Sequence, residues 1–281
     1  MIIDGYAHIM TESIVRDMGI GLQKVPPQLA EMTKRSVKEN VETWLSAMDK
    51  FGIEKTVFMA TASLNKDFTE FINSSSRFVG FAKINPKPYE PVATITTLQK
   101  EFENGMKGVK LYATGDGFDV GCADMYPFYE YCQQNNVPIV IHFGVTIGMR
   151  SNLMAGNPLL LSRILKDFPK LNFVIAHFGA GFFREVLMLK YRTDNLFVDT
   201  SGTNNWIPYQ DNFLILKDVF RKAIEIFGPQ KIIFGSDTRI FPDGYRENIL
   251  SEQIKILDEL NLSSADKEDI MSNNARRVFN I

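Results

Sequence analysis

The sequence predicts a single (β/α)8 (TIM) barrel, and three observations lead to that fold class. Eight short runs rich in β-branched and aromatic residues predict buried strands. Stretches with helical periodicity lie between these runs, as expected when parallel strands are joined by helical crossovers. The chain has 281 residues, close to the ~250 of such a barrel, and the glycine-rich fingerprint typical of the alternative, an open doubly wound sheet, does not follow the first run.

The predicted strands are distributed along the whole chain, and many of them end in Gly, Thr or Asn, which are typical of turns. Their eight ranges are Ile2–His8, Lys55–Thr61, Phe78–Ile84, Gly108–Ala113, Pro138–Gly144, Phe173–Gly179, Leu196–Gly202 and Lys231–Thr238.

The predicted helices are recognised by apolar residues that recur every three to four positions. The clearest is Val41–Phe51, in which Trp44 and Met48 share one face with both end residues. The last, Ser263–Phe279, begins with a serine that we expect to cap its N-terminus. The remaining helices are Pro91–Glu103, Asp124–Asn135, Pro158–Phe168, Arg184–Tyr191, Asn212–Phe227 and Tyr245–Leu260.

Residues 10–40 form a connection that is long for a compact barrel. The segment contains Gly19, Gly21, Pro26 and Pro27, and it is also rich in apolar residues. Long connections of this kind usually have a purpose such as a lid. We therefore expect one domain over residues 1–281, in which residues 10–40 form a lid or a contact with a second subunit.

Composition excludes several classes of protein. The formal net charge is −2, with 31 Lys plus Arg against 33 Asp plus Glu, so no electrostatic footprint for nucleic acid or an anionic membrane is present. No apolar run approaches the ~20 residues of a bilayer span, and no signal peptide is evident at the N-terminus. Two cysteines, Cys122 and Cys132, fit a reduced cytoplasm. The sequence thus predicts a cytoplasmic protein with a small-molecule partner.

The three histidines of the chain all lie at the ends of predicted strands. His8, His142 and His177 end the first, fifth and sixth strands, and Asp237 lies at the end of the eighth. A lone buried histidine is more often a core residue, but three at the rim where barrels place their chemistry favour a site. Imidazole and carboxylate ligands suit zinc, manganese or iron. The pattern therefore predicts a metal site.

These residues lie in motifs that resemble the amidohydrolase superfamily. The motifs are Asp4-Gly5-Tyr6-Ala7-His8, Ile141-His142-Phe143, Ile175-Ala176-His177-Phe178-Gly179-Ala180-Gly181 and Gly235-Ser236-Asp237. More narrowly, the chain is similar to the branch with aminocarboxymuconate semialdehyde decarboxylase-like and resorcylate decarboxylase-like enzymes. Its tail, residues 271–279, resembles the C-terminal helix of that branch.

The resemblance implies one divalent ion, with zinc as the first choice and manganese as the alternative. Its ligands would be His8, His142 and Asp237. His177 would act on metal-bound water or donate a proton, and Asp237 would also handle a proton, so both are implied to be catalytic. A divalent ion lowers the pKa of bound water towards ~7, within reach of an imidazole base.

The first motif departs from the His-x-His of the superfamily because Tyr6 stands at its first position. A tyrosine is a poor ligand while it is neutral, with an ordinary pKa near ~10. Tyr6 could ligate as a phenolate, it could hydrogen-bond substrate while the other ligands hold the ion, or metal binding could be weak or lost. We take the second of these as the expectation.

Three further residues are candidates for substrate binding. Lys110, if it points inward, would hold a substrate carboxylate or, as in binuclear relatives, be carbamylated; otherwise it covers the helix layer with its stem. Asp199 at the seventh strand end would line the pocket, unless it is a capping residue. Arg239 would pair with an acidic substrate, unless it is a surface arginine.

The sequence as a whole predicts a metal-dependent enzyme acting on a small carboxylated or cyclic substrate, by decarboxylation or by hydrolysis. A homodimer is expected from the resemblance and from the apolar early segment. The alternative from a different class is a catalytically impaired barrel that binds a small ligand and lost its chemistry together with the first-strand histidine.

Overall fold

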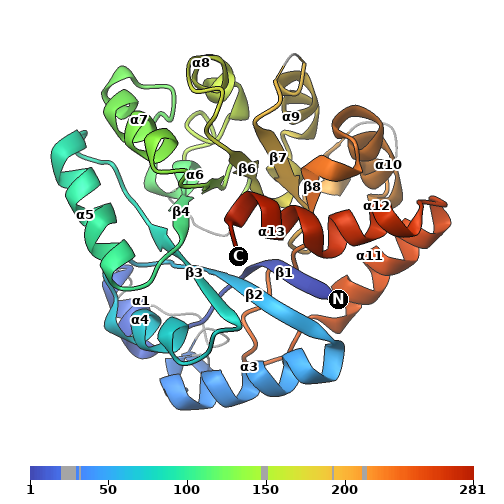
Figure 1. The fold of residues 1–281 in the computed structure, drawn as a ribbon, viewed down its shortest axis with the longest axis horizontal. Coiled ribbons are helices and arrows are strands. Elements are labelled where there is room, and N and C mark those ends of the chain that lie inside the picture. Colours follow the sequence, from blue (N-terminus) through green and yellow to red (C-terminus); the bar gives the residue numbers. More distant parts are fainter. Residues whose placement is uncertain (20–29, 32, 147–150, 192, 211–213) are drawn as a thin grey trace.

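The computed structural model describes residues 1–19, 30–31, 33–146, 151–191, 193–210 and 214–281. Eight parallel strands follow one another in a single sheet in the order β1 to β8, with helices around it (Figure 1). The (β/α)8 barrel is therefore confirmed. The strands are β1 (Ile2–Ala7), β2 (Ile53–Met59), β3 (Phe78–Lys83), β4 (Gly108–Leu111), β5 (Ile139–Ile141), β6 (Phe173–Ile175), β7 (Leu196–Asp199) and β8 (Ile232–Ile233).

The barrel closes because the chain after β8 pairs with β1. The amide of Gly5 donates to the carbonyl of Phe234 at 2.8 Å, and Ala7 forms a parallel bridge with Thr238. All eight predicted strands are present, but each ends before its predicted C-terminal boundary. The predicted residues beyond those ends belong to the turns that line the mouth of the barrel, so their backbone leaves the strand conformation there.

The described helices agree with the predicted ones to within a few residues. They are α3 (Val37–Phe51), α5 (Pro91–Glu103), α7 (Tyr126–Gln134), α8 (Ser162–Asp167), α9 (Phe183–Leu189), α10 (Leu216–Phe227), α11 (Glu247–Glu259), α12 (Ser264–Glu268) and α13 (Asn274–Phe279). Ser263 caps α12 through its hydroxyl, which accepts from the amide of Asp266. The predicted final helix is divided, because a π-helical turn at Asp269–Asn273 separates α12 from α13.

Three described helices were not predicted: α1 (Glu12–Asp17), α4 (Lys66–Asn73) and α6 (Ala113–Asp116). In α4, Asn65 caps the N-terminus, and Phe68, Phe71 and Ile72 form the buried face. The sequence contains both signals, the capping residue and the i, i+3, i+4 spacing of apolar residues, so this helix could have been predicted. The other two are only six and four residues long, too short for periodicity to show.

The described part of residues 10–40 lies partly beside the mouth of the barrel. Ile14 and Val15 on α1 are buried, and Met10 and Met18 line the cavity described below. The other apolar residues of this segment, Ile20, Leu22 and Val25, lie outside the described residues. The lid, the subunit contact and the homodimer stay predictions.

The opposite end of the barrel is closed by the C-terminal helix (Figure 1). Ala275, Val278 and Phe279 of α13 join the interior cluster formed by strand residues such as Ile3 and Phe81. The rings of Phe81 and Phe279 are 4.9 Å apart in an edge-to-face arrangement. Because the interior is filled at this end, a ligand reaches the barrel from the C-terminal ends of the strands.

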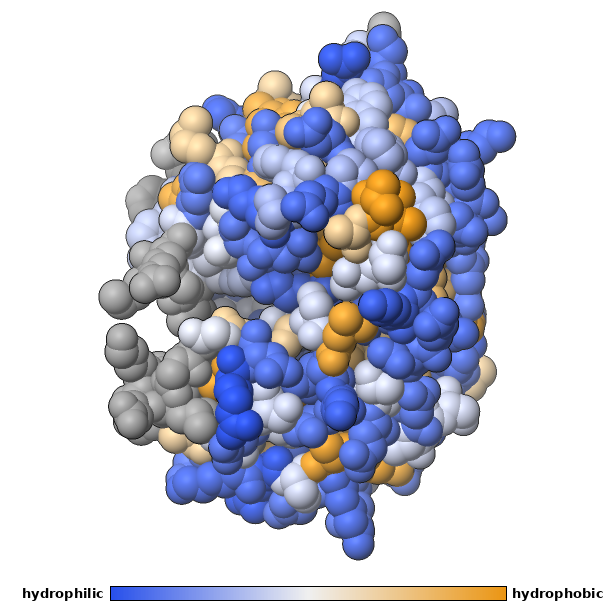
Figure 2. All heavy atoms as spheres, turned by 90° about the vertical axis from the view of Figure 1, so that its left-hand side faces the viewer, coloured by the Kyte–Doolittle hydropathy of each residue, from blue (hydrophilic) through white to orange (hydrophobic). Residues whose placement is uncertain are grey.

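The surface shows no membrane-spanning feature in the part of the chain that is described. None of these helices is long and apolar enough to cross a bilayer. On the face in Figure 2, hydrophobic residues lie in small patches among hydrophilic ones.

Asp4 on β1 is a fully buried carboxylate that ties β1 to the chain after β8. It accepts from the amide of Ser236 at 2.9 Å, from the hydroxyl of Ser236 at 2.5 Å and from the hydroxyl of Tyr245 at 3.0 Å. Burial raises the pKa of Asp4 from 3.8 to about 6, although these hydrogen bonds oppose the shift. The folded protein therefore retains a proton that the unfolded chain releases between these two values.

The free energy of unfolding of the wild type, relative to Asp4→Asn, is expected to fall as the pH rises from about 4 to about 6. The contribution is fully present below 3.8 and is lost as the pH passes about 6, a change of about 3 kcal/mol. Urea denaturation of both proteins across this window measures it. A difference that stays constant with pH would contradict the assignment to Asp4.

Candidate functional site

A cavity of about 770 Å³ opens at the C-terminal ends of the strands. Side chains from several strand ends converge on it, as expected for the catalytic face of such barrels. Seven of the eight residues predicted for the site line it: Tyr6, His8, Lys110, His142, His177, Asp237 and Arg239. Asp199 is the exception.

Left-handed backbone directs two of these side chains. His177, in the short 3-10 turn Ala176–Gly179, has φ 56°, and Asp237, after β8, has φ 55°. This conformation is unfavourable for residues other than glycine and is held by its surroundings at functional sites. The amide of His177 donates to Asp199 at 2.9 Å, and the amide of Asp237 donates to the carbonyl of Tyr6 at 2.8 Å.

Asp199 positions His177 and does not line the cavity. It is 1% exposed, and its Oδ1 accepts from the amides of His177 and Ser201 and from the hydroxyl of Ser201. The Ser201 hydroxyl in turn lies 2.8 Å from Nδ1 of His177, and the Ser201 carbonyl lies 3.1 Å from it. With Nδ1 held in this way, Nε2 is the atom of His177 available to the cavity.

Ser201→Ala is expected to lower kcat about tenfold while KM stays within twofold. The substitution removes one hydrogen bond that fixes the imidazole of His177, worth about 1 kcal/mol, and Ser201 itself does not line the cavity. Steady-state kinetics would measure kcat and KM separately, on the substrate that the screen described under Proposed function identifies. The unfolding midpoint is the control for structure. An equal rise in KM would show that Ser201 acts in binding.

His8 and Asp237 lie within ion-pair distance of each other in the cavity. Nδ1 of His8 lies 2.8 Å from the carbonyl of Met59, and its Nε2 lies 3.5 Å from Oδ1 of Asp237. Arg246 donates to Oδ2 of the same carboxylate at 3.2 Å. Burial lowers the pKa of His8 to about 4, so this imidazole is neutral at pH 7.

The charge state of Asp237 follows from its surroundings. Burial acts to raise the pKa of its carboxyl, but the electrostatic effects of the surrounding histidines and of Arg239 and Arg246 outweigh this and hold the pKa below its usual value. The carboxylate is therefore ionised at pH 7.

Tyr6 lies against two of the histidines as a neutral phenol. Its ring packs edge-on against His8 at 5.2 Å and against His177 at 4.8 Å between centroids. Burial, followed by the negative charges of Asp237 and Asp199, raises the pKa of Tyr6 well above 10. A group in this state is a hydrogen-bond donor to substrate more readily than a phenolate ligand.

Positive charge exceeds negative charge among the described residues that line the cavity. Four cations, Lys83, Lys110, Arg239 and Arg246, face two carboxylates, Asp116 and Asp237. Lys83 pairs with Asp116 at 2.9 Å, whereas Arg239 makes no ion pair with the described residues and its buried Nε has no partner there. Such a wall favours an anionic ligand.

Sequence reasoning missed Lys83 and Arg246. Lys83 had a signal, because a lysine inside the apolar run of the third strand needs a partner if it is buried. Arg246 had none, since only the fold brings it back to Asp237. The end of the seventh strand places Ser201 near the rim, but only the fold shows that it lies between Asp199 and His177.

Whether these residues fit a divalent ion depends on how many donors meet at one point. Zinc takes about four ligands at roughly 2 Å, so its donors approach one another to ~3–3.5 Å. His8 Nε2 and Asp237 Oδ1 satisfy this spacing, but Nε2 of His142 lies 3.2 Å from the carbonyl of Val145. Within the described residues, no three or more His, Cys, Asp or Glu side chains are grouped so that they could hold a metal ion. The donor set does not fit a catalytic ion in this arrangement, and the ligand set implied by the resemblance stays a prediction.

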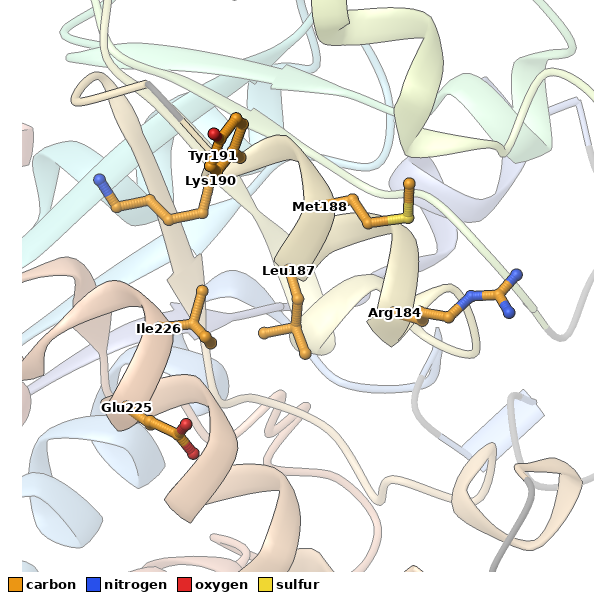
Figure 3. A pocket seen from close by; sticks show the side chains of 7 residues that line it. All are labelled: Arg184, Leu187, Met188, Lys190, Tyr191, Glu225 and Ile226. Atoms are coloured by element: carbon orange, nitrogen blue, oxygen red, sulfur yellow. The ribbon is translucent and has the colours of Figure 1, made fainter.

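A second hollow lies on the outside of the barrel between α9 and α10 (Figure 3). Leu187, Met188 and Ile226 give it an apolar floor, with Arg184 and Glu225 at its border. None of the predicted site residues lies in it, so the mouth of the barrel remains the candidate site.

The fold and this cavity define a (β/α)8-barrel protein with a polar cavity at the C-terminal ends of its strands. Residues 3–281 match the family described as amidohydrolase (Amidohydro_2), so the chain belongs to the amidohydrolase family. The resemblance found in the sequence is thus confirmed.

One relative has a known activity. It is the 2-keto-4-carboxy-3-hexenedioate hydratase of Sphingobium sp. (strain NBRC 103272 / SYK-6), 27% identical over 172 residues. The match covers 55% of this chain and about half, 49%, of that relative.

Solved structures share the fold over nearly the full length. The 5-carboxyvanillate decarboxylase from Sphingomonas paucimobilis is similar with a TM-score of 0.71, 14% identity and 100% and 99% coverage of the two chains. An amidohydrolase from Burkholderia multivorans with bound zinc has a TM-score of 0.69, 15% identity and the same coverage. Relatives of this chain therefore include enzymes of small carboxylates, and one structure of this fold carries zinc.

Proposed function

We propose that this protein is an enzyme that acts on a small carboxylated substrate, cyclic or unsaturated, and that its reaction is decarboxylation. The observation that carries this proposal is the excess of cationic side chains in the cavity that His177 and Asp237 also line. The cations would bind the carboxylate, while His177 and Asp237 would handle protons.

The roles of the residues follow from their surroundings. Arg239, with no ion pair of its own among the described residues, would take a carboxylate of the substrate in a bidentate pair. Tyr6 would donate a hydrogen bond to a neighbouring oxygen. His177 would deliver a proton to the carbon that loses carbon dioxide, or Asp237 would do so after it has accepted a proton from the substrate or from solvent. Hydrolysis would use the same groups on an ester or lactone carbonyl.

Two further candidates are supported by specific observations. The similarity to the hydratase, at 27% identity, favours hydration of an unsaturated acid. Such a reaction would need the same cationic side chains to bind the carboxylate, together with a proton donor. A barrel that binds a ligand without turnover is favoured by Tyr6, which replaces the first histidine of His-x-His.

A substrate screen with the full chain tests the proposal. Aromatic and unsaturated carboxylic acids are assayed for release of carbon dioxide and for loss of ultraviolet absorbance, and lactones are assayed for acid release. His177→Asn is the control for turnover at this site. Carbon dioxide release that this variant abolishes supports decarboxylation, whereas acid release from lactones supports hydrolysis. Binding of these acids without any turnover would contradict the proposal that the protein is an enzyme and would favour a ligand-binding protein.

A further inference from the structure

Lys110 is a buried amine in the candidate site that has no hydrogen-bond partner among the described residues. In the strand register it lies on β4 between Lys83 of β3 and Val140 of β5. The residue is 4% exposed and lines the cavity, and its Nζ has no hydrogen-bond partner among the described residues. A buried lysine almost always has a partner. An acceptor therefore has to come from outside the described chain.

The neighbours of this amine are the residues that the sequence predicted around a metal ion. Nζ of Lys110 lies 4.9 Å from the ring centroid of Tyr6, the ring that also packs against His8 and His177. The charge of Lys110 acts on both His8 and His142. The amine is thus close to the place where the predicted ligands would have to converge.

This place already holds one amine that needs an anionic neighbour. Burial lowers the pKa of Lys110 from 10.5 to about 7, and Asp199 and Asp237 oppose this shift without lying within ion-pair distance of the amine, so an anionic oxygen beside it would favour its charged form. A divalent ion beside this amine and near Arg239 and Arg246 would be repelled at close range in a partly buried site. An anionic oxygen would instead satisfy the N–H donors of an ammonium, of which there are three.

Resting on the proposed function, we propose that the ammonium of Lys110 stands in the place of a catalytic metal ion. It binds the substrate carboxylate and an adjacent hydroxyl or keto oxygen, so the protein works without a divalent ion. The substrate class is therefore a small acid whose carboxylate has such an oxygen on the neighbouring carbon.

The reaction balances with groups of the chain alone. The bond between the carboxylate carbon and the substrate carbon breaks, and carbon dioxide leaves. In an acid with a keto group on the carbon next to the one that carries the carboxylate, the electron pair passes onto the keto oxygen, where Lys110 stabilises the charge, and the carbon then takes one proton. In an aromatic acid with an adjacent hydroxyl, the ring carbon takes the proton first, and the electron pair restores the aromatic ring as carbon dioxide leaves. His177 gives this proton, or Asp237 does so after taking one up from the substrate hydroxyl or from solvent, and solvent restores the starting protonation.

Metal content tests the proposal independently of turnover. The full chain, purified without chelator, is compared with Lys110→Met, which keeps a similar unbranched stem. Lys231→Met is the matched control, because Lys231 also lies over an aromatic ring, 4.3 Å from the centroid of Phe197, but next to the start of β8. We expect less than about a tenth of a zinc or manganese ion per chain in the wild type, and zinc affinity at least tenfold higher in Lys110→Met only. These factors follow from removing one close positive charge.

Binding of salicylate, a carboxylate with an adjacent hydroxyl, is the second readout. Titration calorimetry should show at least a tenfold loss of affinity in Lys110→Met and a change within twofold in Lys231→Met. About one equivalent of zinc or manganese in the wild type, lost in His142→Ala, would overturn the role of Lys110 while leaving the carboxylate site intact. Absence of salicylate binding in a metal-free wild type would instead overturn the carboxylate site and the proposed function with it.

Discussion

Asp237→Asn is expected to lower kcat/KM at least about a thousandfold on the substrate that the screen identifies. The change keeps the shape of the side chain but removes the one ionised group that lies between His8, at 3.5 Å, and Arg246, at 3.2 Å. Proton transfer by a positioned side chain contributes typically ~10²–10⁴-fold to the rate. An amide cannot accept and return that proton.

The matched control for this variant is Asp243→Asn, six residues further along and exposed. It should retain the wild-type rate, because its carboxylate faces solvent. Steady-state rates with an unfolding curve for each protein separate chemistry from stability. An Asp237→Asn enzyme with more than a tenth of the wild-type kcat/KM would remove Asp237 from the mechanism and leave His177 as the acid.

Gly144→Ala is expected to cost about 3–5 kcal/mol of unfolding free energy. Gly144 follows His142 after β5 and has φ 76°, and a Cβ there would lie 2.1 Å from the carbonyl oxygen of Ala180 and 2.4 Å from that of Gly179. Both atoms belong to the backbone beside His177, so no side-chain rotation relieves the contact. The turns after β5 and β6 would have to separate. Backbone strain of this kind is among the causes of large losses of stability in single substitutions.

Gly52→Ala is the control for the conformational part of this effect. Gly52 caps α3 with φ 67°, but its Cβ would meet nothing within 4 Å. This variant should lose only about 1–2 kcal/mol, the cost of left-handed backbone for an L-residue. Urea denaturation measures both variants. Equal losses would show that the two turns can move apart freely, and that the close approach of their backbones does not hold His142 and His177 in place.

The strand and helix pattern of the sequence was enough to predict the barrel. Parallel strands buried on both faces need continuous apolar runs, and the helices between them need one apolar face. The order of apolar and polar residues therefore reveals both kinds of element. Short helices such as α6 were missed because four residues are too few to show a period. The rim positions of His8, His142, His177 and Asp237 followed from the same pattern, since the C-terminal strand ends of such a barrel share one face.

Only the tertiary structure decided what those rim residues do together. Asp199 ends a strand as predicted, yet its oxygens face the amides of His177 and Ser201 and not the cavity. Lys110 points inward and unpaired, and Arg246 returns to Asp237 from a distant turn. Strand ends alone place residues on a face, but the direction of a side chain depends on local backbone, as at His177 and Asp237, and on which charges meet. The sequence by itself determined the fold and the location of the site, whereas the packing of its charges decided its preference for an anion.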